Sequence, residues 1–329
     1  MSRPKGSEIP PEVIQIAEDI KSMKIRGAGK IARSAAQALV IAAEKYDGPP
    51  QGFSKYIRNV GVMLVKTRPT AVSLPNAVFY VLYRVEGLEG EEARRRVINA
   101  GKEFIELSLT ALDRLADIGS KLIQDGDVIL THCHSTAVVR VLQKARQRGV
   151  EFEVYNTETR PRFQGRITAR QLLESGIRVT HITDSAVRSA MRKITKVIVG
   201  ADTITSDGHL VNKVGTSQIA IAAYEAGVPF YSATESIKFS PASFAGGDIV
   251  IEERSAEEVV NMDWLKKRRN TRVLNPAFDI TDPELIHGFI TELGLIPPRA
   301  ASLVIREMFG LKSGYLQLKL IEEEAEWSY

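Results

Sequence analysis

The stretch Asp-Val-Ile-Leu-Thr-His-Cys-His-Ser-Thr-Ala, residues 127–137, joins two kinds of secondary structure. Its first residues form a short apolar run that is typical of a buried parallel strand. A helical pattern then runs from Thr136 to Gly149. In open α/β sheets the loop after such a strand lies at the edge where ligands bind. Cys133, the single cysteine of the chain, falls in this loop.

The same alternation of short apolar runs and helical patterns continues along the chain from residue 125 onward. We expect strands at 127–132, 151–155, 178–183, 196–200 and 229–233, an apolar run at 248–252, and helices at 136–148, 167–175, 186–193 and 216–226. Alternation of short strands with helices predicts a mainly parallel sheet with crossover helices. The fold class is therefore α/β, with a Rossmann-like domain.

The first 120 residues have helical patterns only. Helices are expected over 11–23, 28–45, 56–64, 75–85 and 91–123, and the second of them is rich in alanine, which favours helix. We therefore expect a helical domain over 1–120 and a Rossmann-like catalytic domain over 121–329.

Composition narrows the class of protein. The 329 residues are 44% hydrophobic and 26% charged, as in ordinary globular chains. The net charge is +4 with Lys and Arg spread along the chain, which argues against a nucleic-acid partner. No uninterrupted apolar run of about 18 residues is present, and the N-terminus lacks an apolar leader pattern. One cysteine cannot form an internal disulfide and fits a reducing compartment, so we expect a cytoplasmic protein without membrane contact.

Cys133 has two interpretations. A thiol facing the start of a helix is favoured as thiolate, whereas free cysteine more often packs as a small apolar side chain. His132 and His134 flank it, but neighbours on an extended segment point to alternating faces, so we expect no metal site. The glycine-flanked contexts of Cys–His hydrolases are missing as well.

A second cluster covers residues 199–216. Asp202 lies just past the strand at 196–200, on the same sheet edge as Cys133, where it could be an acid–base partner or a turn cap. Asn212 and Lys213 precede Gly215-Thr216 at an expected helix start, which could be an anion site or a polar loop.

Arg26-Gly27-Ala28-Gly29-Lys30 resembles two phosphate motifs and matches neither. A P-loop would need glycine at Lys24 and a hydroxyl at Ile31, and a dinucleotide fingerprint would need a preceding strand. With both motifs excluded, the segment still offers an arginine beside a glycine-rich turn at the start of a helix. It could bind an anion or act as a hinge between helices.

Seven strings carry a family resemblance that spans most of the chain in order. They are R-G-A (26–28), T-R-P-T-A-V (67–72), T-H-C (131–133), E-T-R-P-R-F-Q-G-R (158–166), G-A-D (200–202), N-K-V-G-T (212–216) and N-P-A-F-D-I-T (275–281). Together they resemble the aldose-1-phosphate isomerases that are related to the regulatory subunits of initiation factor 2B. The resemblance implies a helical N-terminal domain followed by a Rossmann-like domain.

Three roles occur within that family. Its non-catalytic subunits typically lack the cysteine and the aspartate, so Cys133 and Asp202 favour an enzyme. Methylthioribose-1-phosphate isomerases typically read T-H-C-N-A-G where this chain reads T-H-C-H-S-T-A. Ser135 and Thr136 offer hydroxyls that suit a second phosphate better than a methylthio group. The chain is therefore most similar to ribose-1,5-bisphosphate isomerases, with the other two roles as alternatives.

The resemblance implies conversion of ribose 1,5-bisphosphate to ribulose 1,5-bisphosphate by proton transfer with ring opening. Cys133, as thiolate, would remove the C2 proton, and Asp202, held protonated, would donate to the ring oxygen. These roles require a lowered pKa for the thiol and a pKa for the carboxyl that is raised by burial. Proton transfer alone suffices, so no metal or other cofactor is expected.

Substrate-binding residues follow from the same resemblance. We expect Arg26, Gly27, Ala28 and Arg68 at the C1 phosphate, Gln164, Asn212 and Lys213 at the sugar, and Ser135, Thr136 and Ala137 at the C5 phosphate. Lys238 is a further candidate, with an ordinary exposed lysine as its alternative. The expected partners are a sugar bisphosphate and further copies of the chain, in a dimer or hexamer.

Overall fold

The computed structural model describes residues 8–25, 27–68, 72–241, 251–267 and 270–309. The chain divides into two compact units. Unit 1 comprises Met1–Thr110, Ile237–Gly247 and Leu303–Tyr329, and unit 2 comprises Ala111–Ser236 and Asp248–Ser302. The sequence pattern suggests one boundary near residue 120, whereas unit 1 also takes in two later segments. No local pattern indicates such returns, because they depend on contacts between distant parts of the chain.

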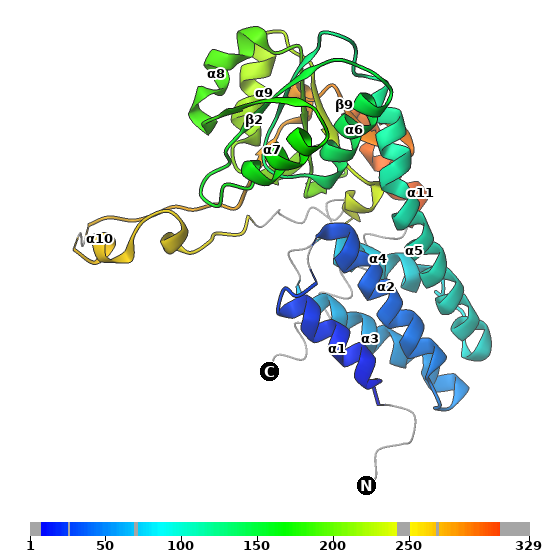
Figure 1. Ribbon diagram of the computed structural model, residues 1–329. Coiled ribbons are helices and arrows are strands. Elements are labelled where there is room, and N and C mark those ends of the chain that lie inside the picture. The colour runs from blue at the N-terminus through cyan, green and yellow to red at the C-terminus, as the bar shows by residue number, and fades with distance from the viewer. Residues whose placement is uncertain (1–7, 26, 69–71, 242–250, 268–269, 310–329) are drawn as a thin grey trace. The chain divides into compact units, whose positions relative to one another are not determined.

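Unit 1 is built from helices, as the sequence predicts. Its helices are α1 (Pro11–Lys21), α2 (Ala28–Glu44), α3 (Phe53–Thr67), α4 (Ser73–Tyr83), the first part of α5 (Gly90–Ser120) and most of α11 (Ala301–Phe309) (Figure 1). Helix α2 contacts α1, α3 and α4. Its alanines are almost fully buried, and small side chains let neighbouring helices approach closely. A Cβ on Gly101 of α5 would lie 2.4 Å from Val40 of α2, so α5 also packs tightly here.

Unit 2 contains a seven-stranded sheet. Its strands, in spatial order, are β10 (Gly294–Ile296), β9 (Gly288–Thr291), β7 (Phe230–Ala233), β4 (Lys196–Val199), β1 (Val128–Thr131), β2 (Glu153–Thr157) and β3 (Arg178–Ile182). All neighbours pair in parallel except β9 and β10, which confirms the predicted mainly parallel sheet. Of the predicted apolar run at 248–252, residues 248–250 lie outside the described residues, and 251–252 belong to no strand.

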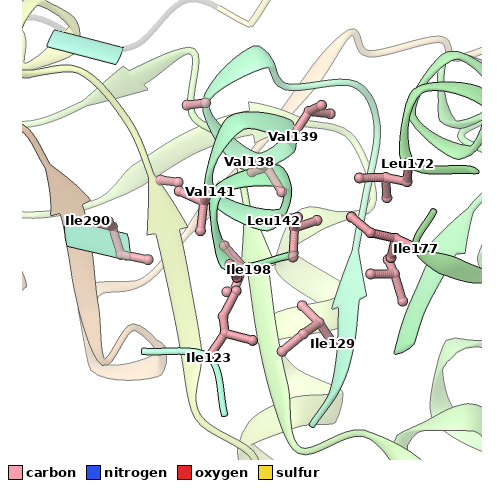
Figure 2. Packing of buried hydrophobic residues seen from close by; sticks show 14 of the residues in the cluster. Ile123, Ile129, Val138, Val139, Val141, Leu142, Leu172, Ile177, Ile198 and Ile290 are labelled. Carbon is pink, nitrogen blue, oxygen red and sulfur yellow. The ribbon is translucent and has the colours of Figure 1, made fainter. Parts of the chain in front are cut away.

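The remaining helices are α6 (Thr136–Gln147), α7 (Gly165–Glu174), α8 (Val187–Ala190), α9 (Thr216–Glu225) and α10 (Met262–Lys266). The sequence predicts α6, α7 and α9, whereas it predicts neither α10 nor α11. The helix predicted over 186–193 is wrong in length, because only α8 is α-helical and 3-10 turns flank it. Val138 and Leu142 of α6 pack with Ile129 and Ile198 of the sheet in one buried cluster (Figure 2). Each such side chain stabilises the fold by about 1.5–3 kcal/mol.

A second, three-stranded antiparallel sheet was not expected. It consists of β5 (Thr203–Ile204), β6 (Leu210–Lys213) and β8 (Phe278–Thr281), in the order β5-β6-β8. Its strands are only two to four residues long, which is too short for a periodic pattern to identify them in the sequence. This sheet places Asn212 and Lys213 opposite Asp279 and Phe278. In the described part of the chain, no helix is long and apolar enough to cross a membrane.

The strand order creates a switch point beside β1. The chain passes from β1 to β2 and β3 on one side and returns to β4 on the other, where Leu130 pairs with Val197. The loops that follow β1 and β4 therefore leave the same sheet edge as neighbours. In open α/β sheets, ligands bind in the crevice at this position.

Candidate active site

The loop after β1 holds Cys133 in an unusual backbone conformation. Its φ is +65°, in the left-handed region that few residues other than glycine adopt. The Cys133 N–H donates to Thr159 Oγ1 at 2.9 Å, and its carbonyl accepts from Thr168 Oγ1 at 2.9 Å. Thr159 is itself left-handed, with a φ of +61°. Backbone strain of this kind persists where surrounding contacts fix it, and it clusters at functional sites.

The thiol of Cys133 has a raised pKa, which contradicts the predicted lowering. Burial raises the pKa of Cys133 to about 11, while the His134 amide and the charge of Lys213 lower it. The charges of Asp202 and Asp184 raise it further. The start of helix α6 favours a thiolate, but the cost of desolvating the charge in this half-buried loop is larger. At neutral pH the group is therefore a thiol.

The pKa of Lys213 is shifted in the opposite direction to that of Cys133. Its side chain is 7% exposed, its Nζ donates to the Ala277 carbonyl at 2.9 Å, and it lies 4.7 Å from the centre of the Phe278 ring. Burial lowers the pKa of Lys213, and the nearby Cys133 raises it. Environments that shift the pKa values of neighbouring groups mark functional sites. Lys213 thus supplies a buried positive charge that acts on the cysteine.

Asp202 has the predicted position but a different environment. It lies between β4 and β5, and its backbone N–H donates to the Val211 carbonyl at 2.9 Å. Its charge acts on the pKa values of both Cys133 and Lys213. The side chain is exposed in unit 2, so the expected burial of this carboxyl is wrong there. The sequence placed Asp202 at the correct edge because two adjacent strands end there.

The carboxylate of Asp279 already occupies the anion-binding position at the start of helix α9. Asp279 accepts from the N–H of Gly215 at 2.7 Å and from the N–H and hydroxyl of Ser217 at 3.2 and 2.9 Å. These are the amides that would otherwise bind a phosphate. Asn212, which is 5% exposed, donates to Thr216 Oγ1 at 3.0 Å. The sequence alone could not reveal the cap, because Asp279 lies on another strand.

Ser135, Thr136 and Ala137 open helix α6. The Ser135 hydroxyl accepts from the Val138 N–H at 3.4 Å, so it caps the helix and keeps its own proton for donation. Gly200 makes room for it, because a Cβ there would lie 2.7 Å from Ser135 Oγ. Thr136 is exposed, whereas the Ala137 side chain is buried in the core, which leaves its backbone amide for any ligand.

Gln164 directly precedes helix α7 and is half-buried. The next residue, Gly165, must be glycine, since a Cβ would come within 1.8 Å of the Thr157 carbonyl oxygen. This close approach brings the 158–166 segment against the end of β2. The segment supplies Thr159, whose contact with Cys133 no sequence pattern indicated.

Within unit 1, Arg26 lies outside the described residues. Gly27 has a φ of +86° and is the residue before helix α2, which begins at Ala28. The Ala28 carbonyl accepts from the Ser73 hydroxyl at 3.0 Å. Arg68 follows the end of α3 and is half-buried. The expected anion cradle at 26–28 thus has the left-handed glycine and the helix start that such a turn requires.

Lys238 also belongs to unit 1. It ends the 3-10 turn Ser236–Lys238 and is half-buried rather than fully exposed. The Asn76 side chain donates to the carbonyls on either side of it, those of Ile237 at 2.7 Å and Phe239 at 2.9 Å. The backbone at Lys238 is therefore anchored to helix α4 by one buried amide.

Comparisons with known proteins agree with these features. Residues 24–298 match the initiation factor 2 subunit family. The ribose 1,5-bisphosphate isomerase of Archaeoglobus fulgidus is 49% identical over 91% of this chain and 94% of its own, and that of Thermococcus kodakarensis is 47% identical over 93% and 97%. The translation initiation factor eIF-2B structure from Pyrococcus horikoshii has a TM-score of 0.72 at 35% identity, covering 88% of this chain and 98% of that one. The chain belongs to the initiation factor 2 subunit family.

Proposed function

We propose that this protein is an isomerase that converts ribose 1,5-bisphosphate to ribulose 1,5-bisphosphate. The observation that carries the proposal is the placement of Cys133 and Asp202 after adjacent strands, with the charge of Lys213 acting on the thiol. Relatives of nearly half-identical sequence bear the name of this activity over almost their whole length. The reaction needs one group that moves a proton from one carbon to the next and a second group that donates a proton to the ring oxygen.

Cys133 and Asp202 together account for every proton that the proposed reaction moves. The Cys133 thiol first passes its proton to the Asp202 carboxylate, a transfer that the positive charge of Lys213 favours. The thiolate then takes the proton from C2 as the bond between C1 and the ring oxygen breaks. Asp202 gives its proton to that oxygen, which becomes the C4 hydroxyl. An enol phosphate remains between C1 and C2. Cys133 then returns its proton to C1 while Asp202 takes the proton of the C2 hydroxyl, which yields the ketose and restores both groups.

The remaining candidates are proposed as substrate contacts. Arg26, Gly27, Ala28 and Arg68 would bind the C1 phosphate, Gln164, Asn212 and Lys213 the sugar, and Ser135, Thr136 and the Ala137 amide the C5 phosphate, with Lys238 as a further cation. The assembly is proposed to be a cytoplasmic homo-oligomer, a dimer or a hexamer, which light scattering on the purified protein would measure.

The decisive experiment compares substrates on purified protein. Ketose formation is measured from ribose 1,5-bisphosphate and from methylthioribose 1-phosphate under the same conditions. Preference for the bisphosphate supports the proposal. Preference for the methylthio sugar would assign the protein to the methylthioribose-1-phosphate isomerases instead. No turnover of either sugar, together with association with initiation factor 2, would indicate a regulatory subunit.

Substitution of the two reacting groups tests the mechanism. Cys133→Ser and Asp202→Asn should each lower kcat by about 100-fold or more, the scale of general acid–base catalysis. Both variants should unfold at the wild-type temperature, because each substitution nearly preserves shape. Asp207→Asn is the matched control, an exposed aspartate of the same segment, and it should retain full turnover. Near wild-type turnover in either reacting-group variant would refute the mechanism.

A further inference from the structure

A buried row of side chains links the Cys133 loop to the segment that carries Lys213. His132 is 2% exposed, and its Nε2 lies 2.9 Å from the Val214 carbonyl oxygen. A carbonyl only accepts, so Nε2 must carry the proton of the ring. Its Nδ1 lies 2.6 Å from Thr157 Oγ1 and therefore accepts from that hydroxyl in the neutral ring. Burial lowers the pKa of His132, which keeps the ring neutral.

The row continues to the backbone of the cysteine. Because Thr157 gives its proton to His132, it must accept at its other contact, Thr159 Oγ1 at 3.3 Å. Thr159 in turn accepts from the Cys133 N–H at 2.9 Å. A backbone donor at one end and a backbone acceptor at the other set the direction of these hydrogen bonds, and the Thr159 hydroxyl can also donate to the Thr157 carbonyl oxygen at 3.4 Å. Both threonines are 0% exposed, so water does not compete for these bonds.

Close packing holds the other end of the row in place. A Cβ on Gly215 would lie 3.1 Å from two atoms of the His132 ring, a tight contact, and the φ of +107° at this position favours glycine. Gly215 and Val214 directly follow Lys213, the last residue of β6. The ring therefore sets the distance between the strand that bears Lys213 and the loop that bears Cys133.

We propose that His132, Thr157 and Thr159 are positioning residues that hold Cys133 in its left-handed conformation and fix its sulfur relative to the charge of Lys213. They touch no reacting atom and act through the backbone amide of Cys133. Their effect on the rate rests on the proposed isomerase function, whereas their effect on the thiol does not. The two can be measured separately because Cys133 is the single cysteine of the chain.

The test removes one hydroxyl from the row. Thr159→Val keeps the shape of the side chain and loses the acceptor for the Cys133 N–H, and Thr159→Ser keeps the acceptor. The first readout is the rate of alkylation by iodoacetamide as a function of pH, and the second is kcat and KM for ribose 1,5-bisphosphate. Thr281→Val is the matched control, because this threonine is 0% exposed and its hydroxyl has no hydrogen-bond partner among the residues that the structure describes.

In Thr159→Val the freed loop should expose the sulfur, and the midpoint of the alkylation profile should fall from about 11 towards about 8.5, the ordinary value for cysteine. Turnover should fall about 10- to 100-fold with KM changed less than about threefold, the effect of a misplaced reacting group. Thr159→Ser and Thr281→Val should match the wild type in both readouts. Thr157→Val breaks the row one bond further away and should give the same pattern if Thr159→Val fails to fold.

The outcomes separate the two proposals. An unchanged alkylation profile in both Thr159→Val and Thr157→Val would overturn the positioning role. A shifted profile in a protein that turns over no sugar phosphate would support the role and refute the isomerase function. A lower unfolding temperature with unchanged alkylation and kcat would show that the row is merely structural, which also overturns the proposal.

Discussion

Lys213 carries the positive charge that, together with the His134 amide, favours the thiolate of Cys133, so removal of this charge has a definite sign. Lys213→Met should raise the thiol pKa above its wild-type value of about 11, because the positive charge that lowers it is gone. Alkylation at pH 9 should then be slower than in the wild type, and ketose formation should fall as well. Lys193→Met, at an exposed lysine, serves as the control and should change neither rate. Faster alkylation of Lys213→Met would contradict the electrostatic role.

The two candidate reacting groups could be located from sequence, but their ionisation could not. Cys133 and Asp202 each follow an apolar strand, and parallel strands end at one edge, so the prediction of a shared edge is confirmed. The pKa of a side chain depends instead on what lies around it. Thr159, Lys213 and Asp184 come from three other places in the chain, and a linear pattern gives no distance between them.

Helix α9 begins with a cap supplied by another element, which makes its stability depend on strand β8. Asp279→Ala would remove the acceptor of the Gly215 and Ser217 amides, and loss of such a cap costs about 1–2 kcal/mol. Urea unfolding should show that decrease in the free energy of unfolding. Inorganic phosphate should restore part of it in the variant, because the freed amides then bind an anion. Asp282→Ala is the control, since that side chain is 68% exposed.

If Asp282→Ala were destabilised as much as Asp279→Ala, the cap would have no special weight.

The same region shows why elements differ in how well sequence predicts them. Helices α2 and α6 have long periodic patterns, and their predicted bounds are confirmed within a few residues. Strands β5, β6 and β8 are only two to four residues long, and they form through pairing across the chain, so no local signal predicts them.

The stability of the chain as a whole should depend on pH through its buried histidines. Burial lowers the pKa of both His132 and His134, so both are neutral in the folded protein and take up protons on unfolding. The free energy of unfolding should therefore be highest above the unfolded pKa of about 6.5 and decrease as the pH falls below it. The slope is at most about 1.4 kcal/mol per pH unit for each histidine.

Paired carboxylates cannot produce this slope between pH 6 and 5. Asp127, whose pKa is lowered by Lys196 against the opposing effect of burial, loses its contribution only below about pH 4, where aspartate is protonated in the unfolded chain. Urea unfolding at pH 8, 6 and 5 measures the dependence. His134→Gln should roughly halve the slope between pH 6 and 5. Equal slopes in His134→Gln and the wild type would mean that the His134 ring does not resist protonation, and the acid sensitivity would then be assigned to His132.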